Sequence, residues 1–123
     1  MSLQWSTGVR NAILDQIETT IGASAILKIR TGAAPASCAT ADSGTVLATL
    51  PLPSDWMAAA SAGAKAKTGT WQDTSADAAG TAAHYRLYAT DGTTCHSQGT
   101  VTATSGGGDM EVDNVVFAPG QSF

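Results

Sequence analysis

The spacing of the apolar residues changes at Gly22, and this change constrains the fold more than any other feature of the chain. Before that glycine, an apolar residue recurs at every fourth position, at Val9, Ile13, Ile17 and Ile21. This spacing places the four side chains on one side of an α-helix. After the glycine, apolar and polar residues alternate, as they do in a strand with one exposed face. The sequence therefore predicts an N-terminal helix followed by a β protein.

The helix is predicted over residues 7–21. Ser6 or Thr7 can accept hydrogen bonds from the amides of the first turn, and Gly22 suits the position after the last turn. Polar residues occupy the side opposite the apolar one: Arg10, Asp15, Gln16 and Glu18. Two interpretations are open. The apolar side packs on the β core of its own chain, or it docks onto a neighbouring molecule.

If the helix docks, the candidate interface consists of its apolar residues, the arginine beside them and the tryptophan that precedes them. These residues are Trp5, Val9, Arg10, Ile13, Leu14 and Ile17.

The rest of the chain predicts a series of short strands separated by turns. We expect strands at 25–31, 45–50, 64–72, 82–89, 95–103 and 109–116, the last interrupted at Asn114 by a bulge. Residues 32–44 are small and turn-forming and predict a loop, whereas 54–63 fit either a helical turn or a connection. Asp91-Gly92 is a strong hairpin signal. The predicted fold is mainly β: a single antiparallel β-sandwich or jelly-roll-like domain over 23–123, preceded by an arm and amphipathic helix over 1–22.

The alternation also predicts which strand residues face water. In 82–89, Ala83, Tyr85 and Leu87 share one face, and His84, Arg86 and Tyr88 share the other, which we expect to be polar. In 25–31, Lys28 and Arg30 are expected on an exposed face. Lys65 and Lys67 are expected to protect an edge strand from unwanted pairing.

The charge content is low, at 13% of residues against about 25% in typical domains. Weak repulsion between copies suits a protein that packs against itself or a scaffold, although a secreted β domain would have a similar composition. The net charge is −4, and the basic residues are scattered, so nucleic acid is not an expected partner. No apolar run approaches the roughly 20 residues of a membrane helix.

No signal peptide is visible at the N-terminus, so synthesis in a reducing cytoplasm is expected. Cys38 and Cys95 are then expected to be free thiols, with a bridge between them as the alternative.

The sequence contains no coherent catalytic or metal site. Cys95 and His96 are adjacent, so a strand would point them to opposite faces, and His84 stands apart from both. Asp109, Glu111 and Asp113 are spaced too widely along a strand to surround one ion without a bend, and a solvated acidic stripe is the simpler interpretation. We therefore expect no enzyme activity, no metal and no cofactor.

Several segments resemble a family of small virion proteins of tailed phages. They are Leu3–Asp15, Ile29–Pro35, Gly69–Trp71, Tyr85–Tyr88 and Gln98–Val101. The likeness extends over nearly the whole chain and depends on order and composition rather than on a catalytic signature. The related proteins continue beyond Gln121-Ser122-Phe123 into a Thr-rich closing strand that this sequence lacks.

The resemblance implies a structural protein of the virion, made in the host bacterial cytoplasm. A capsid cement or decoration protein is favoured, which binds the major capsid protein and forms homo-oligomers, commonly trimers. The alternatives are a tail, fibre or head–tail joining component, and a carbohydrate-binding β-sandwich. The last would need exposed aromatic side chains on one face, for which Trp56, Trp71 and Tyr88 are the candidates.

Overall fold

Helix α1 spans Thr7–Ile21, which confirms the predicted helix. The computed structural model describes residues 2–123. The Ser6 hydroxyl accepts the amide of Val9 at 3.2 Å, and Gly22, at φ 93°, donates its amide to the Glu18 carbonyl at 2.9 Å. Positive φ costs glycine little, so the chain can turn sharply here into the first strand.

The remaining elements are strands, and the fold is mainly β, as predicted. Their bounds are β1 (Ile26–Thr31), β2 (Val46–Pro51), β3 (Gly80–Tyr88), β4 (Cys95–Ala103), β5 (Met110–Val112) and β6 (Val116–Phe117). The strand order is β2-β1-β3-β4-β5, with β6 paired to the start of β3. The predicted hairpin turn at Asp91-Gly92 joins β3 to β4.

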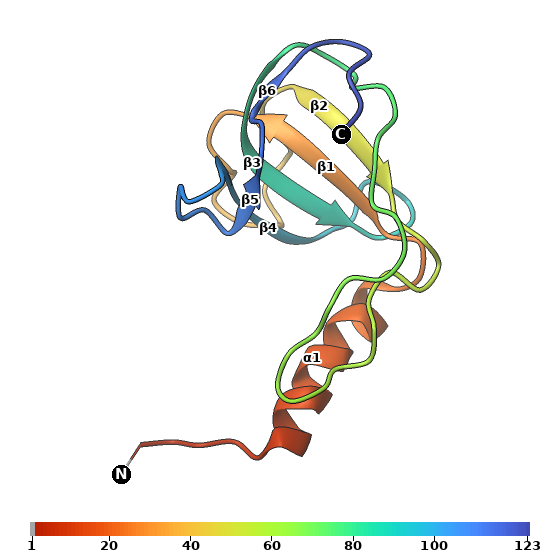
Figure 1. Ribbon diagram of the computed structural model, residues 1–123, viewed down its shortest axis with the longest axis vertical. Coiled ribbons are helices and arrows are strands. Elements are labelled where there is room, and N and C mark those ends of the chain that lie inside the picture. Colours follow the sequence, from red (N-terminus) through yellow and green to blue (C-terminus); the bar gives the residue numbers. More distant parts are fainter. Residues whose placement is uncertain (1) are drawn as a thin grey trace.

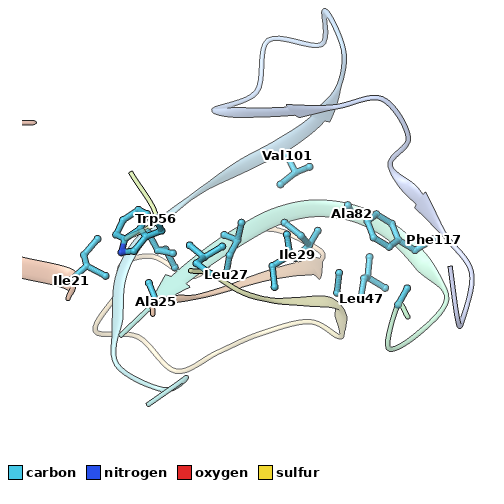
Figure 2. Packing of buried hydrophobic residues seen from close by; sticks show 14 residues of the cluster. Ile21, Ala25, Leu27, Ile29, Leu47, Trp56, Ala82, Val101 and Phe117 are labelled. Atoms are coloured by element: carbon cyan, nitrogen blue, oxygen red, sulfur yellow. The ribbon is translucent and has the colours of Figure 1, made fainter. Parts of the chain in front are cut away.

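One face of this sheet carries the hydrophobic core. Leu27 of β1 lies opposite Leu87 of β3 and Leu50 of β2. Figure 2 shows the core extending from Ile21 and Trp56 at one end to Phe117 at the other. Trp56 is 1% exposed, so the indole closes the end of the core from which the helix departs.

The second layer over the core consists of segments between and after the strands rather than of a second regular sheet. Backbone hydrogen bonds join Asp73 to Phe123 in both directions, at 2.8 and 2.7 Å, and Ala76 to Gln121 at 2.7 Å. Asp77 donates its amide to the Leu47 carbonyl of β2 at 2.8 Å. The domain is thus sandwich-like, with one layer largely irregular.

The sheet is not antiparallel throughout, because β5 runs parallel to β4. The interruption expected at Asn114 is a full break rather than a bulge, since β5 ends at Val112 and β6 begins at Val116. The glycines of the β4–β5 loop allow the chain to double back beside β4. A Cβ at Gly106 would stand 2.6 Å from the Thr102 Cβ, so only glycine permits this approach.

Residues 56–68 form a narrow hairpin, where a strand over 64–72 was expected. Only two isolated bridges are present, Met57 with Lys67 and Ser61 with Ala64. The Ala58 amide also donates to the Ala66 carbonyl at 2.8 Å. This hairpin follows α1 away from the β domain (Figure 1), and we call α1 together with hairpin 56–68 the stalk.

The expectation of an exposed polar face on β1 and β3 is wrong. His84, Arg86 and Tyr88 are buried, as is Arg30. Loop 32–44 covers this face and supplies the polar partners that make burial possible. Arg86 donates to the carbonyls of Ser37, Cys38 and Thr40 at 2.9, 3.2 and 3.0 Å.

Candidate docking surface on the helix

The side of α1 that faces its own protein is the polar side. The Asn11 Oδ1 accepts the Gly63 amide at 2.9 Å, and the Asp15 Oδ1 accepts the Ala60 amide at 2.8 Å. One turn further, the Glu18 Oε1 accepts the Met57 amide at 3.2 Å. Side chains of α1 thus fix three backbone amides of the hairpin, two on its first arm and one in its turn.

Lys65 fastens the other arm of the hairpin to the helix. Its Nζ lies 2.8 Å from the Asp15 Oδ1 and 3.2 Å from the Glu18 Oε2, and its side chain is 4% exposed. The expected role of Lys65 in protecting an edge strand is therefore wrong, because it is a partner of the helix. Lys67 remains exposed, with its Nζ 5.9 Å from the centre of the Trp71 ring.

The ionisation of these groups reflects their mutual contacts. The hydrogen bond from Lys65, helped by the one from the Ala60 amide, holds the pKa of Asp15 below its usual value. Burial alone would raise the pKa of Glu18, but its hydrogen bonds to the Met57 amide and Lys65 outweigh this effect and lower it. The hydrogen bond to Asp15 raises the pKa of Lys65. The three groups are therefore charged together at neutral pH.

The apolar side of α1 faces outward. We call Val9, Ile13 and Ile17 the apolar stripe; they are 40%, 55% and 45% exposed. Trp5, 55% exposed, lies in the extended arm that leads into the helix. Of the two interpretations left open by the sequence, packing on the chain's own β core holds for Ile21 alone and is wrong for the apolar stripe. Within residues 2–123, nothing covers the stripe.

The other two predicted interface residues lie beside the stripe. Leu14 is half-buried, and Arg10 lies across Gly63, where an added Cβ would be 3.2 Å from the arginine Cζ. Together with Ile13 these residues line a shallow hollow of about 220 Å³. The structure thus brings all six predicted residues to the outer end and one side of the stalk.

The stripe continues onto the β domain. Ile17 lines a second, mainly apolar hollow of about 220 Å³ at the base of the helix. Its other walls come from the hairpin and the sheet: Leu27, Trp56, Met57, Trp71, Tyr85, Leu87, Ser97 and Met110. The sequence did not single out this region, because its residues come from seven separate segments. Leu3 of the arm, which at 79% is more exposed than Trp5 or any residue of the stripe, was also missed.

The acidic residues considered for metal binding accept hydrogen bonds from backbone amides of their own chain. The Asp109 Oδ2 accepts the Thr100 amide at 2.9 Å, and the Glu111 carboxylate accepts the amides of Ser105 and Gly107 at 3.0 and 3.1 Å. Both carboxylates therefore shape the β4–β5 loop. Across residues 2–123, no group of three or more His, Cys, Asp or Glu side chains is arranged to hold a metal ion.

In the described part of the chain, neither histidine is hydrogen-bonded to a cysteine, as a Cys-His nucleophilic pair would require. His84 Nδ1 lies 2.7 Å from the Gly32 carbonyl oxygen in the interior, whereas His96 is exposed. The cysteines instead meet each other, with Cys38 and Cys95 Sγ atoms 2.8 Å apart. Residues 57 positions apart in sequence could not be paired from spacing alone.

The aromatic residues considered for carbohydrate binding do not form an exposed platform. Trp56 and Tyr88 are buried, and Trp71 is half-buried against Trp56, with ring centres 5.9 Å apart. Among the described residues, no helix is long and apolar enough to cross a membrane.

Comparisons with known proteins give no relative. The chain matches no protein-family model, no curated protein and no solved structure at a significant level.

Proposed function

We propose that this chain is a structural protein of a tailed-phage particle, most specifically a capsid cement protein that docks through its stalk onto the major capsid protein. The observation that carries the docking role is the orientation of α1. The helix turns its hydrogen-bonding side inward and leaves three branched apolar side chains in water. The assignment to a capsid depends on the sequence resemblance to small phage virion proteins.

Exposed apolar side chains arranged in one line are costly to leave in water and are common at protein interfaces. Here the line extends from Trp5 through the apolar stripe to the hollow at the base of the helix. Every carboxylate on α1 is held by Lys65 or by hairpin amides. A partner can therefore cover the stripe without burying an unpaired carboxylate, which would be unfavourable.

The direct test mixes the purified protein with capsids of its own phage that lack it. Replacing both isoleucines of the stripe, Ile13→Ser with Ile17→Ser, should weaken binding by about tenfold or more, because interface energy concentrates in a few apolar anchors. The matched control is Val116→Ser, which removes an apolar side chain of similar exposure (59%) from β6.

The control variant should bind as the wild type does. Unchanged binding by the stripe variant, with both proteins folded by circular dichroism, would refute the docking role. The same binding loss in both variants would mean that general surface polarity, not the stalk, governs attachment.

The head location has its own test. A cement protein binds throughout the lattice and stabilises the shell by binding the assembled state, so its copy number in purified particles should match the number of lattice positions. A few copies per particle would instead indicate a tail, fibre or head–tail joining component. Light scattering on the isolated protein should give the mass of a homo-oligomer, with a trimer as the favoured state.

A further inference from the structure

Cys38 and Cys95 lie in contact on the covered face of the sheet. Cys38 belongs to loop 32–44 and Cys95 begins β4, and their Sγ atoms are 2.8 Å apart. Both are free thiols and both are half-buried. No side chain can intervene at this distance, so each cysteine is the other's nearest possible sulfur partner.

Contacts with β3 fix the backbone on both sides of the cysteine pair. Cys38 is anchored through its own carbonyl, which accepts a hydrogen bond from Arg86, as do the neighbouring carbonyls of Ser37 and Thr40. Cys95 lies opposite Tyr88 in the β3–β4 ladder. Loop and strand are therefore both fixed to β3, and closing a bond between the sulfurs needs side-chain adjustment rather than refolding.

We propose that Cys38 and Cys95 form an intramolecular disulfide when the folded protein meets a small disulfide oxidant, such as oxidised glutathione. The bond would fasten loop 32–44 covalently over the buried Arg86 side chain. This inference concerns the isolated chain and does not depend on the proposed capsid role.

The reaction is a pair of thiol–disulfide exchanges. The thiolate of one cysteine attacks a sulfur of oxidised glutathione and expels one glutathione thiolate. The thiolate of the other cysteine then attacks the mixed disulfide at the protein sulfur and expels the second. The two cysteines lose two protons and two electrons, and one glutathione disulfide is reduced to two glutathione molecules.

The local electrostatics make this a slow reaction at neutral pH. Burial, together with the hydrogen bond to Cys38, raises the pKa of the Cys95 thiol to about 11. Little Cys95 thiolate is therefore present in the folded protein at pH 7, and oxidation should accelerate as the pH rises. A protein made in a reducing cytoplasm would stay reduced there and close the bond after release.

The test incubates the reduced protein with oxidised glutathione at pH 8 and follows thiol content in denaturant, intact mass and melting temperature. We expect both thiols to disappear, the monomer mass to fall by about 2 Da, and Tm to rise by about 5–10 °C, since the bond closes a long loop. Addition of dithiothreitol should restore the original Tm.

Two single variants, Cys38→Ser and Cys95→Ser, provide the controls. Neither should show the rise in Tm or the loss of 2 Da with the same oxidant. Persistence of both thiols in the wild-type monomer, or a bond found only between two molecules, would overturn the proposal. Because the wild type can be cycled between redox states, the result stands even if a serine variant fails to fold.

Discussion

The β domain and the stalk distribute polar and apolar side chains in opposite ways. The domain buries leucines and isoleucines on one face of its sheet, and it buries Arg30 and Arg86 on the other. The stalk buries the Lys65 ammonium between Asp15 and Glu18 on the side that faces the hairpin, whereas Ile13 and Ile17 on the opposite side remain in water. In the stalk, hydrogen-bonding demand rather than hydrophobicity decides which side of the helix is covered.

The reason lies in the hairpin that covers the helix. Hairpin 56–68 has only a sparse ladder of its own, so several of its backbone amides need other acceptors. Buried amides without partners are strongly unfavourable. Asn11, Asp15 and Glu18 of α1 supply the acceptors for Gly63, Ala60 and Met57. An apolar helix side in the same place would have left these amides unpaired.

Among the polar contacts, the largest expected effect is on the global stability of the β domain. Arg86→Met should lower the free energy of unfolding by about 3 kcal/mol, because it removes the buried donor of the loop carbonyls and one of the two arginines paired with Asp42. The stalk should unfold with the domain and not before it. Urea denaturation followed by fluorescence measures the change. A loss under about 0.5 kcal/mol would mean that loop 32–44 is held by other contacts.

A smaller and local effect is expected from Lys65→Met. The substitution removes the cation that joins Asp15 to Glu18, so the hairpin should open more often while the sheet stays intact. Amide hydrogen exchange should accelerate several-fold at Ala60 and Gly63 and stay unchanged in β1 and β3. The matched control is Lys67→Met, at an exposed lysine on the same arm, which should leave the exchange of both amides as it was.

Acid should act in the same direction as Lys65→Met. Asp15 and Glu18 have lowered pKa values in the folded protein, so they bind protons more weakly there than in the open chain. Their stabilising contribution is present above the ordinary carboxyl range near pH 4 and is lost as the pH falls through and below it. Exchange measured between pH 6 and pH 3 should show hairpin amides losing protection first. Equal loss in stalk and domain would contradict this order.

The smallest expected effect is on the apolar stripe. Ile13→Ser with Ile17→Ser should change the free energy of unfolding by no more than about 0.5 kcal/mol per residue, because both side chains are already half in water. Trp56→Ala provides the contrast, with a cost of about 3–5 kcal/mol for a fully buried indole. A stripe variant as destabilised as Trp56→Ala would mean that the stripe packs against its own chain in solution.

The sequence predicted elements better than it predicted their surroundings. The four-residue spacing of apolar side chains from Val9 to Ile21, with caps at Ser6 and Gly22, predicted the observed bounds of α1. Such a prediction succeeds because helix formation depends on neighbours within one turn. The same spacing separates the two sides of a helix without telling which one is covered. That choice depends on hairpin amides about forty or more residues away.

For the candidate site too, the sequence predicted the position of some residues, and it predicted the surroundings of others wrongly. All six predicted interface residues lie on or beside the outward surface of the stalk, and their role in binding stays a prediction. The exposed face expected for His84 and Arg86 was wrong because alternation distinguishes faces only when one of them meets water. Here the small residues of loop 32–44 cover the second face, and Asp42 makes a buried arginine tolerable.

The junction between α1 and the β domain affects how much conformational entropy the protein loses when α1 binds a partner. Trp56 Nε1 donates to the Gly22 carbonyl at 2.9 Å, and Ile21 is buried beside it in the core. A helix of 15 residues, about 22 Å long, is thus held at a set angle before a partner arrives. Association then does not have to order α1, so the conformational entropy that a flexible segment of this length would lose on binding has already been lost during folding.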